Sequence, residues 1–137
     1  MSAAAHAQFA KVPQPVRPAP GALQASQALD ERSYRVDAAR HIYAAYPSRI
    51  MQGTMPPLMH AVLVTETEVD AKGAVRSVRI VRAPAAAREV TPWVVQLIRR
   101  AAPLPPPLKM GRVRYVEVWL VDKSGRFQVH SLTEGQR

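Results

Sequence analysis

The chain has 137 residues, 47% of them hydrophobic, and carries a formal net charge of +9 without a single cysteine. This length allows one domain with one core, and the hydrophobic content excludes a wholly disordered protein. The lack of cysteine excludes a disulfide framework and a cysteine-ligated zinc site, while the positive charge favours nucleic acid, an anionic surface or an acidic protein as partner.

Residues 1–33 are predicted to be a flexible segment rich in proline and alanine. Ala5-His6-Ala7 matches the small-residue pattern that precedes a signal-peptidase cut, and two interpretations stay open: a signal-peptide remnant, which would indicate export to the periplasm, or a flexible alanine-rich terminus without further meaning. Four prolines between residues 11 and 20 favour an extended polyproline II tether. No apolar run in the sequence reaches the roughly 18 residues that a membrane-spanning helix needs.

A helix is predicted from about residue 34, where the periodicity changes. Tyr34, Ala38, Ile42 and Ala45 recur at helical spacing, and Pro47 ends the pattern. A short helical turn is expected to follow. The histidines are scattered and have no partner three or four residues away, so we predict no metal site and no cofactor.

The segment 61–82 predicts a β-hairpin. Its first strand, 61–69, has its more apolar face at the odd positions, and its turn runs from Asp70 to Gly73, where glycine provides the left-handed conformation. In the returning strand the arginines recur every third residue, which departs from alternation and predicts a bulge near Ser77. Cross-strand pairs between these arginines and the glutamates of the first strand are also expected.

A second helix and a second hairpin complete the domain. Thr91 and Pro92 are the predicted N-cap and first helical residue, and the helix ends at Arg100 before the prolines of 103–107. A long strand, 112–121, is followed by a turn from Asp122 to Gly125 and by a returning strand. The order helix, hairpin, helix, hairpin predicts an α+β domain over 34–132, with an antiparallel sheet of three to four strands, two helices on one face, and a tail at 133–137.

These elements resemble the C-terminal domain of TonB-type energy transducers, with the TolA C-terminal domain as a relative. The matching stretches are IYAAYPSRIMQG, AVLVTETEVDAKGAVRSVRIVRAP and IRRAAPLPPP, in that order. The family's positions are filled by Tyr46-Pro47, Gly53, Asp70, Gly73, Val75, Val78, Ile80, Leu104, Pro105 and Pro106. The resemblance implies a periplasmic, non-enzymatic module that pairs a sheet edge with an extended segment of an outer-membrane transporter or another envelope protein.

The sequence departs from that family in three ways. A membrane anchor is missing, the residues TMPPLMH at 54–60 are inserted before the first strand, and a further strand follows the one that normally closes the sheet. If this last strand pairs with 112–121, it covers the edge that the family uses. It is then either a cap against uncontrolled pairing or a new docking edge along 126–132.

The terminal hairpin carries the residues that we expect to contact a partner. They are Tyr115, Glu117, Trp119, Arg126, Gln128 and His130, all on the assumption that they are exposed. In the opposite arrangement, Tyr115 and Trp119 face the helices as part of the core. The partner is an envelope peptide segment or a second copy of the chain; a role in binding a polymer such as peptidoglycan is not separated from this by the sequence.

A nucleic-acid module is the alternative function. Tyr115 and Trp119 alternate with Arg112 and Arg114, a combination that can stack bases and neutralise phosphates. The aromatic motif of ribonucleoprotein-type domains is missing, however. No nucleophile motif and no glycine-rich phosphate loop occur in the sequence, so we expect no catalysis.

Overall fold

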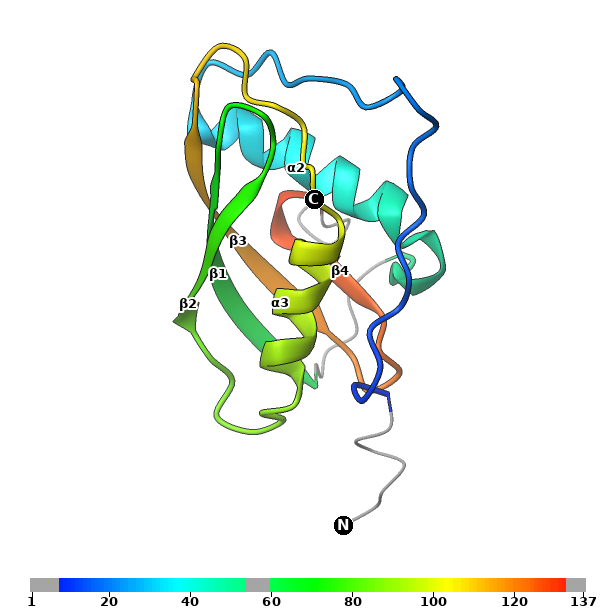
Figure 1. Cartoon of the computed structure of the whole chain (residues 1–137). Coiled ribbons are helices and arrows are strands. Elements are labelled where there is room, and N and C mark those ends of the chain that lie inside the picture. The colour runs from blue at the N-terminus through cyan, green and yellow to red at the C-terminus, as the bar shows by residue number, and fades with distance from the viewer. Residues whose placement is uncertain (1–7, 54–59, 133–137) are drawn as a thin grey trace.

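Two helices and a four-stranded sheet form the domain in the computed structural model, which describes residues 8–53 and 60–132 (Figure 1). The sheet is antiparallel, with the strand order β2-β1-β3-β4, and both helices pack on one face of it. This confirms the predicted α+β class. The Ala5-His6-Ala7 motif, residues 54–59 of the insertion and the tail 133–137 lie outside the described residues. The elements are α2 (Glu31–Ala45), the 3₁₀ turn η1 (Pro47–Arg49), β1 (Ala61–Val69), β2 (Val75–Arg82), α3 (Val90–Arg100), β3 (Val113–Val121), β4 (Phe127–Val129) and the 3₁₀ turn η2 (His130–Leu132).

Helix α2 starts where the side chain of Asp30 accepts a hydrogen bond from the Ser33 amide at 2.8 Å, as an N-cap does. Its predicted apolar stripe is confirmed, since Tyr34, Ala38, Ile42 and Ala45 are all buried. At the end of the helix, the Tyr46 hydroxyl donates to the Leu97 carbonyl at 2.6 Å. This bond ties the end of α2 to α3, and burial raises the pKa of the Tyr46 hydroxyl to about 12.

Helix α3 begins at Val90, two residues earlier than the capping pattern predicts. The amides of Val90 and Thr91 already bond to the carbonyls of Ala87 and Arg88, so the chain turns before Thr91 and this residue lies inside the helix. The prediction of Thr91 as N-cap is therefore wrong. The apolar stripe of the helix is buried; its members are Val90, Val94, Leu97, Ile98 and Ala101, with Trp93 beside them.

Strand β1 lies between β2 and β3 and alternates strictly, with its odd residues buried under the helices. Its pairing with β2 has two register shifts, at which Arg76 and Val81 have no residue opposite them on β1. The first of these bulges is the one predicted near Ser77. Together they place Val75, Val78 and Ile80 against the core, while Arg79 lies opposite Glu66 on the other face.

Both hairpins use the same turn. Asp70 Oδ1 accepts from the amides of Lys72 and Ala74, and Asp122 Oδ1 accepts from those of Ser124 and Arg126, at 2.9–3.1 Å. Gly73 and Gly125 have φ of +89° and +80°, as predicted for these positions. The carbonyl of Gly73 also accepts a bond from the Leu104 amide at 2.8 Å, which joins the first turn to the proline-rich segment after α3.

The N-terminal segment packs along the domain over residues 8–30, as Figure 1 shows for the blue part of the chain. Phe9 is buried against Trp93, whose indole Nε1 donates to the Lys11 carbonyl at 3.1 Å. Further on, the Ser26 amide bonds to Pro106 O at 2.9 Å and its hydroxyl to Asp37 at 2.6 Å. Over residues 8–30, buried aromatic and polar anchors therefore attach the segment to the domain.

Candidate functional site

The two edges of the sheet differ in how their backbone groups are satisfied. Beside β3, strand β4 covers only the last three residues, Trp119 to Val121. On the remainder of this edge, carboxylates accept from two of the outward amides. Glu31 Oε2 accepts from Val116 N at 2.9 Å, and Glu117 Oε2 accepts from Val118 N at 3.0 Å. Two backbone donors that an added strand would need are therefore already occupied.

The outer side of β4 is closed in the same way. The Phe127 carbonyl accepts from the Met51 amide at 2.8 Å, and the Val129 amide donates to the Tyr43 hydroxyl at 3.0 Å. The buried Gln128 side chain donates to the carbonyls of Met51 and Gly53 at 2.8 and 2.9 Å. The terminal hairpin thus covers the last three residues of β3, which favours the capping alternative over a docking edge along 126–132.

Strand β2 forms the opposite edge. Because Val116 and Val118 point their amides away from β1, the alternation of the antiparallel ladder directs the backbone groups of Val78 and Ile80 away from the sheet. Within residues 8–53 and 60–132, β2 pairs with β1 alone, and no side chain bonds to these outward groups. The outward amides and carbonyls of Val78 and Ile80 therefore form a vacant edge for a further strand.

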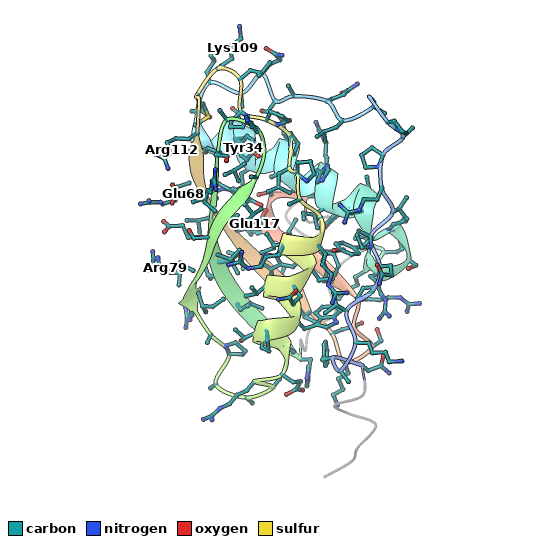
Figure 2. All side chains as sticks on the ribbon, viewed as in Figure 1. Tyr34, Glu68, Arg79, Lys109, Arg112 and Glu117 are labelled. Carbon is teal, nitrogen blue, oxygen red and sulfur yellow. The ribbon has the colours of Figure 1, made fainter. Side chains whose placement is uncertain are left out.

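Charged side chains cover the sheet face that the helices leave open. Figure 2 shows Glu68, Arg79 and Arg112 on the side of the sheet away from the helices. Arg79 pairs with Glu66 at 3.1 Å, while Glu68 pairs with Arg114 at 3.3 Å and with Arg112. The hydrogen bond from Arg114, together with Arg112, holds the pKa of the Glu68 carboxyl below its usual range. Since the arginines are mostly exposed, these pairs contribute little to stability.

Most of the residues predicted to contact a partner are buried. Tyr115, Glu117, Trp119 and Gln128 are each at most 4% exposed, so their predicted exposure is wrong; Arg126 and His130 are exposed. The reason is the register of β1 with β3, which aligns Tyr115 and Trp119 with Thr67 and Leu63 on the helix side of the sheet. Val116, Val118 and Leu120 are consequently the half-buried residues of the open face.

Glu117 is a carboxylate within the core face. Figure 2 shows it between the sheet and the helices. Its Oε2 accepts bonds from Val118 N and, at 3.3 Å, from Ser131 N, while Oε1 has no partner among the described residues. Burial raises the pKa of this carboxyl above its usual range. Its position holds η2 against the edge of β3, a role that the sequence pattern does not reveal.

The structure removes the basis for base stacking on the sheet. The rings of Tyr115 and Trp119 pack in the core, where Tyr115 meets Tyr34 and Trp119 meets Phe127. On the open face of the sheet, β3 therefore presents valine, leucine and arginine side chains, but neither of these rings. The described residues also contain no group of three or more histidine, aspartate or glutamate side chains that could hold a metal ion.

A groove of about 650 Å³ lies between the N-terminal segment and α2. Three of its polar side chains are engaged with the protein itself. Arg17 donates to the Ala102 carbonyl at 2.8 Å, His41 Nε2 bonds to the Ala101 carbonyl at 2.8 Å, and Asp37 accepts from Ser26. These contacts attach the segment to the domain, so we assign the groove a structural role.

Comparison of the chain with protein-family models, with curated proteins and with solved structures gives no match. None of the helices formed by the described residues is long and apolar enough to cross a membrane. The sheet edge at β2, with its unused backbone groups and adjacent arginines, is the candidate functional site.

Proposed function

We propose that the protein is a non-enzymatic protein-binding module that adds an extended segment of its partner to the sheet at β2. The observation that carries this proposal is the difference between the two edges. Glu31, Glu117, Tyr43 and Met51 occupy four outward backbone groups on one side, whereas no described side chain bonds to those of Val78 and Ile80. In strand addition, main-chain hydrogen bonds supply affinity and the flanking side chains supply specificity.

The resemblance to TonB-type C-terminal domains supports the same class of function. It favours the periplasm as the compartment and an envelope protein as the source of the extended segment. In such domains the strand that closes the sheet provides the docking edge. In this chain the equivalent β3 is covered by β4 and by two carboxylates, so we place the docking edge on β2.

Amide hydrogen exchange measured by NMR tests the proposal. Short extended peptides are added to the ¹⁵N-labelled full chain, and the expected result is slower exchange at Val78 and Ile80 in the bound state. The variant Val78→Pro removes one outward amide while leaving the pairing with β1 in place, as proline on an edge strand allows, and it should abolish the effect. If Val78→Pro loses its dispersed amide signals and so does not fold, Ile80→Pro takes its place as the test variant. Slower exchange at Val116 or Val129, with β2 unchanged, would overturn the proposal.

A further inference from the structure

We propose that the β2 edge selects an extended peptide in which acidic and apolar residues alternate, with the acidic side chains on the open face of the sheet. This inference rests on the proposed strand addition and identifies the class of partner. It follows from the side-chain pattern that β2 presents on its two faces and from the charges around it.

The two faces of β2 have different chemistry at the edge. Val78 and Ile80 direct their side chains to the helix side, where they pack partly buried against the core. Arg79 lies between them and points to the open face, beside Glu66. A strand that bonds to the backbone of Val78 and Ile80 places two side chains beside this apolar pair and an intervening one beside Arg79. The intervening residue forms a non-hydrogen-bonded pair with Arg79, in which side chains approach most closely.

The charge at this edge is positive. Four arginines, Arg79, Arg82, Arg112 and Arg114, lie on the open face and its rim against two carboxylates, Glu66 and Glu68. Arg82 is exposed and forms no ion pair with a described residue. An acidic side chain on the added strand is therefore attracted by Arg82, which has no ion pair of its own, and by Arg79. A basic side chain is repelled by both.

The same arginines disfavour a second copy of the chain as the occupant of this edge. If two β2 strands paired antiparallel about Arg79, each Arg79 would face its counterpart, and each Arg76 would face an Arg82. Like charges directly opposite one another destabilise a strand pair. Such a pairing would thus concentrate six arginines along one seam, while an acidic peptide neutralises them.

Peptide titration measures the selection directly. Three fluorescein-labelled hexapeptides are compared by anisotropy on the full chain. In each peptide, valine alternates with one other residue, which is glutamate in the first, glutamine in the second and lysine in the third. The glutamate peptide is expected to bind about tenfold more tightly than the glutamine peptide, and its advantage should shrink as salt rises. The lysine peptide should bind most weakly.

Charge reversal shows whether the preference comes from this edge. Arg82→Glu is expected to weaken binding of the glutamate peptide by roughly tenfold and to strengthen binding of the lysine peptide. Arg126→Glu is the matched control, since Arg126 is also exposed but lies at the far hairpin, and it should change neither affinity by more than about twofold. Dispersed amide spectra confirm that both variants are folded.

The outcomes separate the two proposals. Equal affinity of the three peptides, with slower exchange at Val78 and Ile80 in each case, would overturn the acidic preference and leave strand addition in place. If no peptide slows exchange at these amides, strand addition at β2 is itself overturned. A loss of glutamate-peptide binding in Arg126→Glu but not in Arg82→Glu would move the acidic site to the terminal hairpin.

Discussion

The carboxylate of Glu31 accepts a hydrogen bond from the amide of Val116 at 2.9 Å, across 85 residues of sequence. The same carboxylate pairs with Arg35 one turn further along α2, at 2.7 Å. Glu31 therefore occupies a backbone donor at the β3 edge as well as supporting the first turn of the helix. This one side chain links the start of the helical layer to the closed edge of the sheet.

Replacing Glu31 tests that link. Glu31→Ala leaves the Val116 amide without its acceptor, so we expect faster hydrogen exchange at Val116 and a loss of about 1 kcal/mol in the free energy of unfolding. Glu31→Gln retains an acceptor oxygen and should lose less. NMR exchange and urea titration give both quantities. Unchanged exchange at Val116 in Glu31→Ala would contradict the cap.

The buried carboxyl of Glu117 predicts a specific dependence of stability on pH. Since burial raises its pKa in the folded state, the unfolded chain ionises first as pH rises, and the group's contribution to stability falls between the unfolded and the folded pKa. Glu117→Gln removes this ionisation. We expect the difference in unfolding free energy between the variant and the wild type to shift in favour of the variant from about pH 4 upwards. Urea titrations of both proteins at several pH values measure the difference, and a constant difference would contradict the prediction.

The first hairpin turn depends on glycine at position 73. A Cβ at Gly73 would lie 2.1 Å from the Leu104 carbonyl oxygen, which is backbone and cannot move aside as a side chain does. We expect Gly73→Ala to cost about 3 kcal/mol or more, from the left-handed conformation and the clash together. Gly111→Ala is the control, since Gly111 has a similar φ of +76° but no atom within 4 Å; it should cost only about 1–2 kcal/mol. Equal losses in denaturant titrations would show that the contact with Leu104 has no effect.

The N-terminal segment is expected to contribute to the stability of the domain. Phe9 stacks on His60 with ring centroids 5.6 Å apart and meets Trp93 edge-on at 5.1 Å. Phe9→Ala should therefore lower the free energy of unfolding by about 2–4 kcal/mol and change the tryptophan fluorescence. Val16→Ala, at a position 58% exposed, should have little effect. A segment that behaves as a free tether would give no change in either variant.

Local patterns predicted the elements well. The helical spacing of Tyr34 and Ile42, the alternation in β1 and the repeated Asp-to-Gly turns all correspond to the structure, because each depends on neighbours within a few residues. The arginine spacing also gave the first bulge in β2. The second bulge was missed, since its only trace is the added Val81 near the end of the strand.

The face of β3 could not be predicted from its own sequence. Both faces carry apolar residues, and only the pairing of Trp119 with Leu63 decides which one meets the helices. The edge caps depend on still more distant partners, as Glu31 and Val116 show. The size of the aromatic residues could have indicated the buried face, because Trp119 and Tyr115 bury more area than the valines on the other face of β3. The docking of residues 8–30 was missed because the prolines indicated a tether, whereas Phe9 and Ser26 supply the anchors.

The closure of the β4 edge by Met51 and Tyr43 limits how far the sheet can grow. A sheet with two vacant edges can join end to end with its copies without limit, and that is how fibrils elongate. In the part of the chain that the structure describes, the Phe127 carbonyl and the Val129 amide are occupied, so β4 does not offer its outer backbone groups to a further strand. The occupied β4 edge thus disfavours end-to-end joining of copies through both sides of the sheet.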